Sequence, residues 1–162
     1  MQVGIVADSH DHMERIGQAV QILRERGIKD LIHAGDFVAP FALIPIVDAG
    51  FRLHAVFGNN DGEIQGLSAM AEPVGGIHKG PYRFELGGKR FLVAHAPLSD
   101  KQIAKEGGKT DYIVTGHTHV AGFERVGDLV VVNPGELCGW LKGRSTFGIL
   151  EMESGEWELI EL

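Results

Sequence analysis

The hydrophobic and polar positions at the start of the chain predict one strand and one helix. Met1–Ala7 is a continuous apolar run that ends in a polar cluster, as in a strand buried on both faces of a sheet. Asp11 and Glu14 then precede apolar residues at helical spacing, and this stretch ends near Gly27. The pattern therefore predicts a buried strand followed by a helix of about four turns.

Later segments continue the same alternation and then change character. Four more apolar runs that end at polar or glycine-containing loops predict strands at Asp30–Ala34, Leu53–Phe57, Arg90–Ala94 and Asp111–Thr115. Weaker helical patterns lie between them at Pro40–Gly50, Glu63–Glu72 and Ser99–Glu106. After residue 120, short β-rich runs between turns predict antiparallel strands at Gly122–Arg125, Leu129–Asn133, Ser145–Met152 and Glu156–Leu162. This order predicts a layered α/β domain with mixed sheets.

Composition and charge narrow the class of protein. A chain of 162 residues with 44% hydrophobic and 23% charged residues fits one packed domain, residues 1–162. The net charge of −7 argues against an extended nucleic-acid surface or binding to an anionic membrane. No apolar stretch approaches the ~20 residues that cross a bilayer. With the single cysteine Cys138 and no signal-peptide pattern, we expect a cytoplasmic protein.

Residues that can bind a metal ion follow five of the predicted strands. They are Asp8 and His10, Asp36, Asn59, His95, and finally His117 and His119. Because ligand sites collect at the carboxyl ends of strands in α/β sheets, we expect one shared site. Taken alone, the pair His117 and His119 leaves buried packing and a single-metal site open. Single His residues more often have a packing role, and we interpret His33, His54 and His78 in that way.

Seven such residues exceed what one ion needs. Their mixture of imidazole and oxygen ligands suits Mn²⁺, Fe, Zn²⁺, Ni²⁺ or Co²⁺. Two adjacent cations repel each other, so a carboxylate between them is required, and Asp36 is the candidate because it is central in the order. The glycines at 35, 58 and 116 precede these ligands and are expected to let the backbone turn sharply out of each strand. The pattern predicts a site for two divalent ions.

The motifs together resemble one known superfamily. Asp8-x-His10, Gly35-Asp36, Gly58-Asn59-x-Asp61, His95 and Gly116-His117-x-His119 occur in the order of the calcineurin-like metallophosphoesterases, and the resemblance covers nearly the whole chain. The short length and the segment from Val132 to Trp140 are similar to the short archaeal and bacterial phosphodiesterase branch. The resemblance implies a four-layer α/β/β/α sandwich with two mixed β-sheets.

The resemblance also implies a role for each ligand. Asp8, His10 and His119 would bind one ion, Asn59, His95 and His117 the other, and Asp36 would bridge the two. Mn or Ni is favoured. A hydroxide held between the ions would attack the phosphorus of a phosphodiester in line, with Asp36 and Asn59 as the catalytic side chains. The amide NH₂ of Asn59 would remain free to contact a phosphate oxygen.

One position departs from the superfamily. Many members have a His general acid where this chain has Asn60, and an amide cannot donate a proton near pH 7. We therefore expect faster turnover of aryl than of alkyl phosphodiesters unless another residue such as His12 donates. Asn59, Asn60 and His12 are the predicted substrate contacts. Glu136 and Cys138 receive no role.

The leading hypothesis is a two-metal phosphodiesterase that acts on a small phosphodiester. The resemblance also suggests a homodimer. The first alternative is a non-enzymatic metal-binding scaffold of the same fold, because a retromer subunit in this superfamily has that function. The second is a nuclease for short oligonucleotides. The occupation of all seven ligand positions favours an enzyme over a scaffold.

Overall fold

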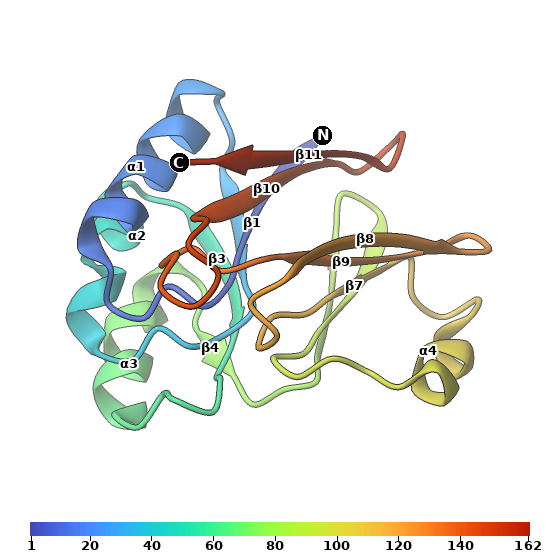
Figure 1. Ribbon diagram of the computed structural model, residues 1–162, viewed down its shortest axis with the longest axis horizontal. Coiled ribbons are helices and arrows are strands. Elements are labelled where there is room, and N and C mark those ends of the chain that lie inside the picture. The colour runs from blue at the N-terminus through green and yellow to red at the C-terminus, as the bar shows by residue number, and fades with distance from the viewer.

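Two β-sheets lie face to face at the centre of the protein, with helices on the outside. This computed structural model describes residues 1–162. The six-stranded sheet has the order β11-β10-β1-β2-β3-β4, and the five-stranded sheet has the order β5-β6-β7-β9-β8. Figure 1 shows α1, α2 and α3 together on one side of the molecule and α4 on the other. The predicted four-layer α/β/β/α sandwich is confirmed.

The six-stranded sheet combines parallel strands with a C-terminal hairpin. Its strands are β1 (Gln2–Val6), β2 (Asp30–His33), β3 (Arg52–Val56), β4 (Ile77–His78), β10 (Thr146–Glu151) and β11 (Glu156–Glu161). The strands β1 to β4 are parallel, whereas β10 pairs antiparallel with β1 and β11 antiparallel with β10. The loops after β1, β2 and β3 therefore leave the same edge of the sheet.

The five-stranded sheet has parallel central strands and antiparallel edges. Its strands are β5 (Tyr82–Leu86), β6 (Lys89–Val93), β7 (Tyr112–Val114), β8 (Ala121–Val126) and β9 (Leu129–Pro134). The strands β6, β7 and β9 are parallel, and β5 and β8 pair antiparallel at the two edges. The loops after β6 and β7 consequently emerge on one side, as the loops of the first sheet do.

Alternating side chains on the buried strands supply two cores. In β2, Leu31 packs with the core under the helices, whereas Ile32 packs with the core between the sheets. The helices α1 (Met13–Glu25), α2 (Ile44–Asp48) and α3 (Ile64–Ala71) supply the outer core. On the far face, Ile103 of α4 (Asp100–Glu106) packs against a small cluster from β6, β7 and β9. Burial on both faces explains why the central strands have continuous apolar sequences.

The structure adds three features that the pattern of residues did not predict. The strand β4 has only two residues, and β5 is an edge strand whose side chains alternate between partly buried and exposed. The segment predicted as one helix at Pro40–Gly50 divides into a 3-10 turn, Pro40–Leu43, and the short helix α2. Pro45 lacks a backbone N–H, so it suits the first turn of a new helix but not the middle of a longer one. None of the helices combines the length and apolar character needed to cross a membrane.

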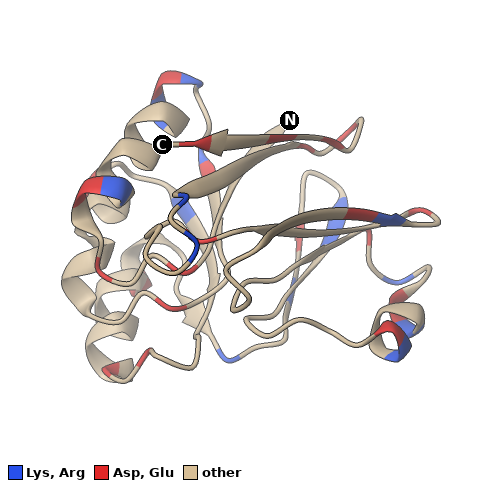
Figure 2. Ribbon diagram, viewed as in Figure 1, with Lys and Arg blue, Asp and Glu red and all other residues tan.

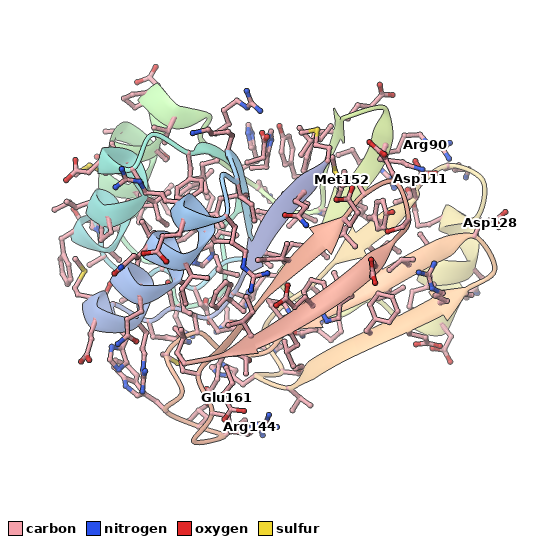
Figure 3. The ribbon with its side chains drawn as sticks, turned by 90° about the horizontal axis from the view of Figure 1, so that it is seen from above. Arg90, Asp111, Asp128, Arg144, Met152 and Glu161 are labelled. Carbon is pink, nitrogen blue, oxygen red and sulfur yellow. The ribbon has the colours of Figure 1, made fainter.

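Charged residues of both signs are interspersed over the helices, hairpins and loops, as Figure 2 shows. Two ion pairs illustrate how the exposure of such pairs varies. Arg90 and Asp111 form a two-pronged pair, with Nη2 2.8 Å from Oδ1 and Nε 3.0 Å from Oδ2. Arg144 and Glu161 pair at a more exposed place, and Figure 3 labels all four residues. The Arg90 hydrogen bonds outweigh partial burial and lower the pKa of Asp111 to about 2.

Replacing Arg90 with glutamine should destabilise the protein in a pH-dependent way. The folded pKa of Asp111 lies below its unfolded value near 4, so the pair stabilises the fold above about pH 4 and loses this contribution as the pH falls toward 2. At pH 6 we expect a loss of about 1 kcal/mol, or about 2–4 °C in Tm. Calorimetry at pH values from 6 downward should show that the difference in Tm between the variant and wild type becomes smaller.

Arg144→Gln is the matched control for this prediction. Its pair with Glu161 is about half exposed on both sides, so solvent screens the attraction. We expect a smaller change in Tm for Arg144→Gln than for Arg90→Gln. If the difference in Tm between Arg90→Gln and wild type did not change with pH, the proposed role of the Asp111 carboxylate would be contradicted.

Candidate metal centre

All seven predicted ligands lie on loops that follow the carboxyl ends of five strands. Asp8 and His10 follow β1, Asp36 follows β2 and Asn59 follows β3; His95 follows β6, and His117 and His119 follow β7. The two sheets bring these five loops to one place, where the side chains contact one another over the distances given below. The structure therefore brings all seven side chains together, and their role as one metal site stays a prediction.

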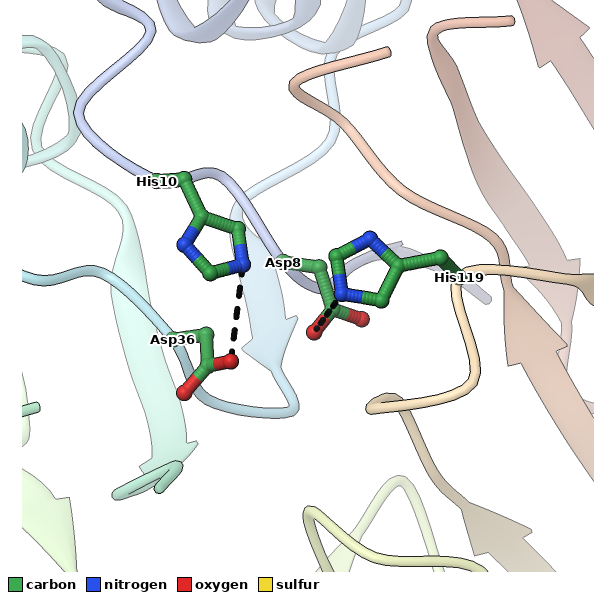
Figure 4. Close-up of side chains that lie close together, drawn as sticks. All are labelled: Asp8, His10, Asp36 and His119. Carbon is green, nitrogen blue, oxygen red and sulfur yellow. Dashed lines mark ion pairs between the residues drawn. The ribbon is translucent and has the colours of Figure 1, made fainter. Parts of the chain in front are cut away.

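The first group of side chains is Asp8, His10, Asp36 and His119. Their ligand atoms all lie within 4.8 Å of one another. Figure 4 shows His10 pointing toward Asp36 and His119 toward Asp8, with 3.4 Å from His10 Nε2 to Asp36 Oδ2 and 3.5 Å from His119 Nε2 to Asp8 Oδ1. These are the residues that the family resemblance assigns to the first ion, together with the proposed bridging carboxylate.

The second group is Asn59, His95 and His117. Asn59 Oδ1 lies 2.8 Å from both His95 Nε2 and His117 Nδ1, and these two ring nitrogens are 3.2 Å apart. Asp36 Oδ2 is 3.4 Å from His95 Nε2, the same distance as from His10 Nε2. One carboxylate oxygen of Asp36 therefore lies between the two groups.

The donor atoms at this place fit a divalent cation. His10 Nε2 is buried and has no hydrogen-bond partner, although buried polar atoms are normally satisfied. His95 Nδ1 lies 2.8 Å from the carbonyl oxygen of Ala34, so Nδ1 carries the proton and Nε2 is free to act as a ligand. Imidazole nitrogens, carboxylate oxygens and one amide oxygen together suit the first-row transition metals.

The buried carboxylates have pKa values shifted in opposite directions. Burial raises the pKa of Asp8, and attraction to the His119 imidazole opposes this. Burial would also raise the pKa of Asp36, but the close His95 imidazole and the hydrogen bonds from Asn60 outweigh it and lower the pKa of Asp36. Asp36 is thus held in the ionised form that a bridging ligand requires.

Backbone strain is concentrated at the same loops. Seven residues other than glycine have positive φ: Asp8, His10, Asp11, Asp36, Val38, His117 and His119. Five of the seven are predicted metal ligands. Such conformations are unfavourable by about 1–3 kcal/mol each and persist where the surrounding structure enforces them, commonly at functional sites. The strain independently marks this edge of the sheets as a functional site.

Two of the three glycines that precede the ligands are needed for a reason other than the expected sharp turn. Only Gly35 has a positive φ, of 97°. At Gly58, an added Cβ would lie 2.1 Å from Asp36 Oδ1, and at Gly116 it would lie 2.9 Å from Asp8 Oδ2. Gly58 and Gly116 are therefore required for close approach of the loops and not for a sharp turn.

Two buried residues without a predicted role hold these loops together. Asp61 accepts hydrogen bonds from the backbone N–H groups of Asp36, Val38 and Gly58. His33 accepts one from Gly35 N and lies 3.0 Å from Ser9 Oγ, and burial lowers its pKa to about 3. The interpretation of His33 as a packing residue was incomplete. His54 and His78 do pack, against Phe84 and Tyr82 respectively.

Glu136 is the functional residue that the sequence did not disclose. Its fully buried carboxylate lies 2.6 Å from His119 Nδ1 and accepts hydrogen bonds from Leu141 N at 3.0 Å and Lys142 N at 2.5 Å. Burial would raise the pKa of Glu136, but these hydrogen bonds outweigh it and lower the pKa. A carboxylate on the far nitrogen orients a metal-binding histidine and raises its basicity. Cys138 is also close, with Sγ 3.6 Å from Glu136 Oε2, and burial raises the pKa of its thiol to about 11.

Glu136→Gln should weaken metal binding at the first group. The amide keeps the shape of the side chain but loses the charge that supports His119, and removal of such partners lowers metal affinity about 10–100-fold. Competition with a fluorescent chelator measures this. Glu124→Gln, at an exposed position on β8, is the control and should bind metal as wild type does. Unchanged affinity in Glu136→Gln would contradict the role of Glu136.

Asn60 and His12, which are predicted to contact the substrate together with Asn59, have different neighbours in the structure. The Asn60 side chain donates from Nδ2 to Asp36 Oδ2 at 2.8 Å, and its backbone N–H donates to Asp36 Oδ1. Asn60 therefore restrains the carboxylate, and a contact with substrate stays a prediction. The His12 ring lies 5.6 Å from that of Trp140, on the side of the first group. A role for His12 with substrate likewise stays a prediction.

A cleft adjoins the second group. It has a volume of about 450 Å³, and Asn59, His95 and His117 form part of its wall. Lys79 supplies a positive charge to the lining, and Gln102 supplies an amide. A space of this size beside convergent polar groups is typical of a small-molecule site.

The fold and this constellation of side chains define a metal-dependent phosphoesterase. The chain belongs to the calcineurin-like phosphoesterase superfamily, whose domain profile matches residues 1–155. It is similar to Phosphodiesterase MJ0936 of Methanocaldococcus jannaschii, with 35% identity over 165 residues that cover 100% of this chain and 99% of the relative. The resemblance to the short phosphodiesterase branch is thus confirmed.

Solved structures agree with this membership. A structure described as a novel archaeal phosphodiesterase has a TM-score of 0.92 at 35% identity, and the match covers 100% of both chains. Escherichia coli YfcE, a phosphoesterase, has a TM-score of 0.70 at 16% identity and covers 99% of this chain and 98% of its own. Vacuolar Protein Sorting 29 of Cryptosporidium parvum has a TM-score of 0.69 at 14% identity, and the match covers 99% of this chain and 96% of that one. The last two show the fold alone.

Proposed function

We propose that the protein is a two-metal phosphodiesterase that cleaves a small phosphodiester. The observation that carries the proposal is the position of Asp36 Oδ2, at 3.4 Å from both His10 Nε2 and His95 Nε2. A single carboxylate oxygen shared by two groups of ligands is the arrangement that two adjacent cations need. The 35% identity to a phosphodiesterase supports the choice of a diester over a monoester.

Each ligand has a proposed place. Asp8, His10 and His119 hold one ion, Asn59, His95 and His117 hold the other, and Asp36 joins them. Mn or Ni is the proposed metal, since imidazole-rich sites with oxygen ligands accept both. Bound divalent cations activate the attacking water and offset the charge that develops on the phosphoryl oxygens.

The remaining steps depend on the side chains themselves. Asn59 is exposed and directs Oδ1 toward the histidines, so its NH₂ group is available to a phosphate oxygen of the substrate. Asn60 holds Asp36 in place through two hydrogen bonds. Because Asn60 cannot donate a proton near pH 7, the proposed enzyme prefers a diester with an acidic leaving group.

A metal add-back assay tests the proposal. Protein stripped of metal is assayed on bis(p-nitrophenyl) phosphate with Mn²⁺, Ni²⁺, Mg²⁺ or Zn²⁺, and in parallel on p-nitrophenyl phosphate. We expect metal-dependent hydrolysis of the diester, faster than that of the monoester. Absence of diesterase activity with all four metals would refute the proposal and leave a non-enzymatic scaffold as the better reading.

The two histidines after β7 should be separable by metal titration. His119→Ala removes a ligand of the first ion, which it shares with Asp8 and His10, and His117→Ala removes one from the second, which it shares with Asn59 and His95. Isothermal titration calorimetry should show that each variant loses affinity mainly at a different one of two sites. Loss of the same ion in both variants would show that the split is wrong.

A further inference from the structure

Trp140 is a large exposed ring beside the candidate metal centre. Its side chain is 62% exposed, whereas tryptophan is on average a highly buried residue. The ring centroid lies 6.3 Å from that of His10 and 5.6 Å from that of His12. His10 is itself stacked on His119 at 5.4 Å, so a row of rings leads from two metal-ligand candidates outward to Trp140.

The backbone around Trp140 is held firmly against the site. Glu136, which contacts His119, accepts hydrogen bonds from the backbone N–H groups of Leu141 and Lys142, directly after the tryptophan. On the other side, Cys138 N donates to Asp8 O at 3.1 Å. The same contacts that orient the ligands thus fix the backbone that carries the indole beside the site, so little backbone entropy is lost when the ring binds a ligand.

We propose that Trp140, backed by His12, is a stacking shelf for a nucleobase, and that the substrate of the phosphodiesterase proposed above is a nucleotide phosphodiester. This inference rests on the proposed function and names its substrate class. Every nucleobase has a π-face that stacks on an indole without a need for clustered Lys or Arg. Stacking is therefore a means of binding nucleotides that suits a chain with a net charge of −7.

A binding experiment tests whether Trp140 stacks on a nucleobase and does not depend on hydrolysis of a substrate. The chain has two tryptophans, Trp140 and Trp157, so Trp157→Phe leaves Trp140 as the only indole. AMP, added with Mn²⁺, should quench the tryptophan fluorescence of Trp157→Phe in a saturable way, whereas ribose 5-phosphate should not. In Trp140→Leu, AMP should bind roughly tenfold more weakly by calorimetry, as loss of one base stack implies. Equal affinity of AMP for wild type and Trp140→Leu would overturn the inference.

A kinetic comparison separates this inference from the proposed function. Thymidine 5′-(p-nitrophenyl) phosphate and methyl p-nitrophenyl phosphate have the same leaving group and differ only in the nucleoside. Trp140→Leu should raise KM for the nucleoside ester roughly tenfold with a smaller change in kcat, and Trp140→Phe should restore most of the affinity. The effect on the methyl ester should be much smaller.

The possible failures are distinguishable. Hydrolysis of neither ester by wild type with any metal would refute the proposed function, while the AMP titration would still decide whether the shelf binds a base. An equal loss on both esters in Trp140→Leu would assign Trp140 a structural role and overturn the inference. So would conversion of a dimer to a monomer by Trp140→Leu in sedimentation velocity, because the ring would then be a contact between two copies.

Discussion

Asp36→Asn should abolish the joint binding of two metal ions and lower diesterase activity at least about a thousandfold. Two divalent cations about 4 Å apart repel each other by ~16 kcal/mol at an effective dielectric constant of 20, and a carboxylate between them offsets much of this. Asp36 is placed for that role by its oxygen at 3.4 Å from both His10 Nε2 and His95 Nε2. Removal of a single neutral donor from an active site already lowers rates about 10²–10³-fold, and Asp36 carries a full charge.

The measurement is a calorimetric metal titration together with the rate on bis(p-nitrophenyl) phosphate. Wild type should bind two ions, whereas Asp36→Asn should bind at most one with comparable affinity. Asp48→Asn is the control, because Asp48 is an exposed carboxylate at the end of α2. Circular dichroism confirms that the variant is folded. Two ions bound by Asp36→Asn with affinities within tenfold of wild type would contradict the bridging role.

Gly58→Ala should destabilise the fold and disturb both groups of ligands. The added Cβ would lie 2.1 Å from Asp36 Oδ1 and 2.4 Å from the backbone nitrogen of Asp36. That nitrogen cannot move freely because it donates to Asp61. Overpacking of this kind is unfavourable by about 1–3 kcal/mol, and we expect the upper end, a fall of about 6–12 °C in Tm. Metal affinity should fall as well, since Asn59 is the next residue.

Gly62→Ala is a matched control four residues further along the chain. A Cβ at Gly62 meets nothing within 4 Å, and its φ lies outside the positive region, so the change should stay within about 0.5 kcal/mol. Thermal unfolding of both variants without metal compares the two positions directly. If Gly58→Ala and Gly62→Ala unfolded at the same temperature, close approach of the Asp36 loop would not be the reason for Gly58.

Most of the strands and the seven candidate ligands could be predicted because their signals are local in the sequence. Continuous apolar runs mark strands buried on two faces, and the polar residue that follows each run marks the carboxyl end of the strand. The edge strand β5 was missed although Tyr82, Phe84 and Leu86 alternate with polar residues. Its side chains are only partly buried, and such short alternations are also common in loops.

Contacts between loops that are distant in the sequence could not be predicted from such local patterns. The hydroxyl of Thr118, between the two histidines, accepts a hydrogen bond from Asn133 Nδ2, which also donates to Gly116 O. Glu136 was unassigned because nothing in its neighbourhood along the chain indicates that it contacts His119. These residues acquire their roles only when β7 and β9 pair side by side.

The sequence by itself determined the class of fold, the five loops and the residue types that select a transition metal, since these follow from hydrophobic periodicity and ligand chemistry. Tertiary structure decided which atoms meet. It placed one oxygen of Asp36 between two histidines, put a buried carboxylate behind His119 and set Trp140 at the rim of the site. Those outcomes depend on how two sheets pack and bring loops together, because hydrogen bonds and ring contacts act through space over a few ångströms, whatever the separation along the chain.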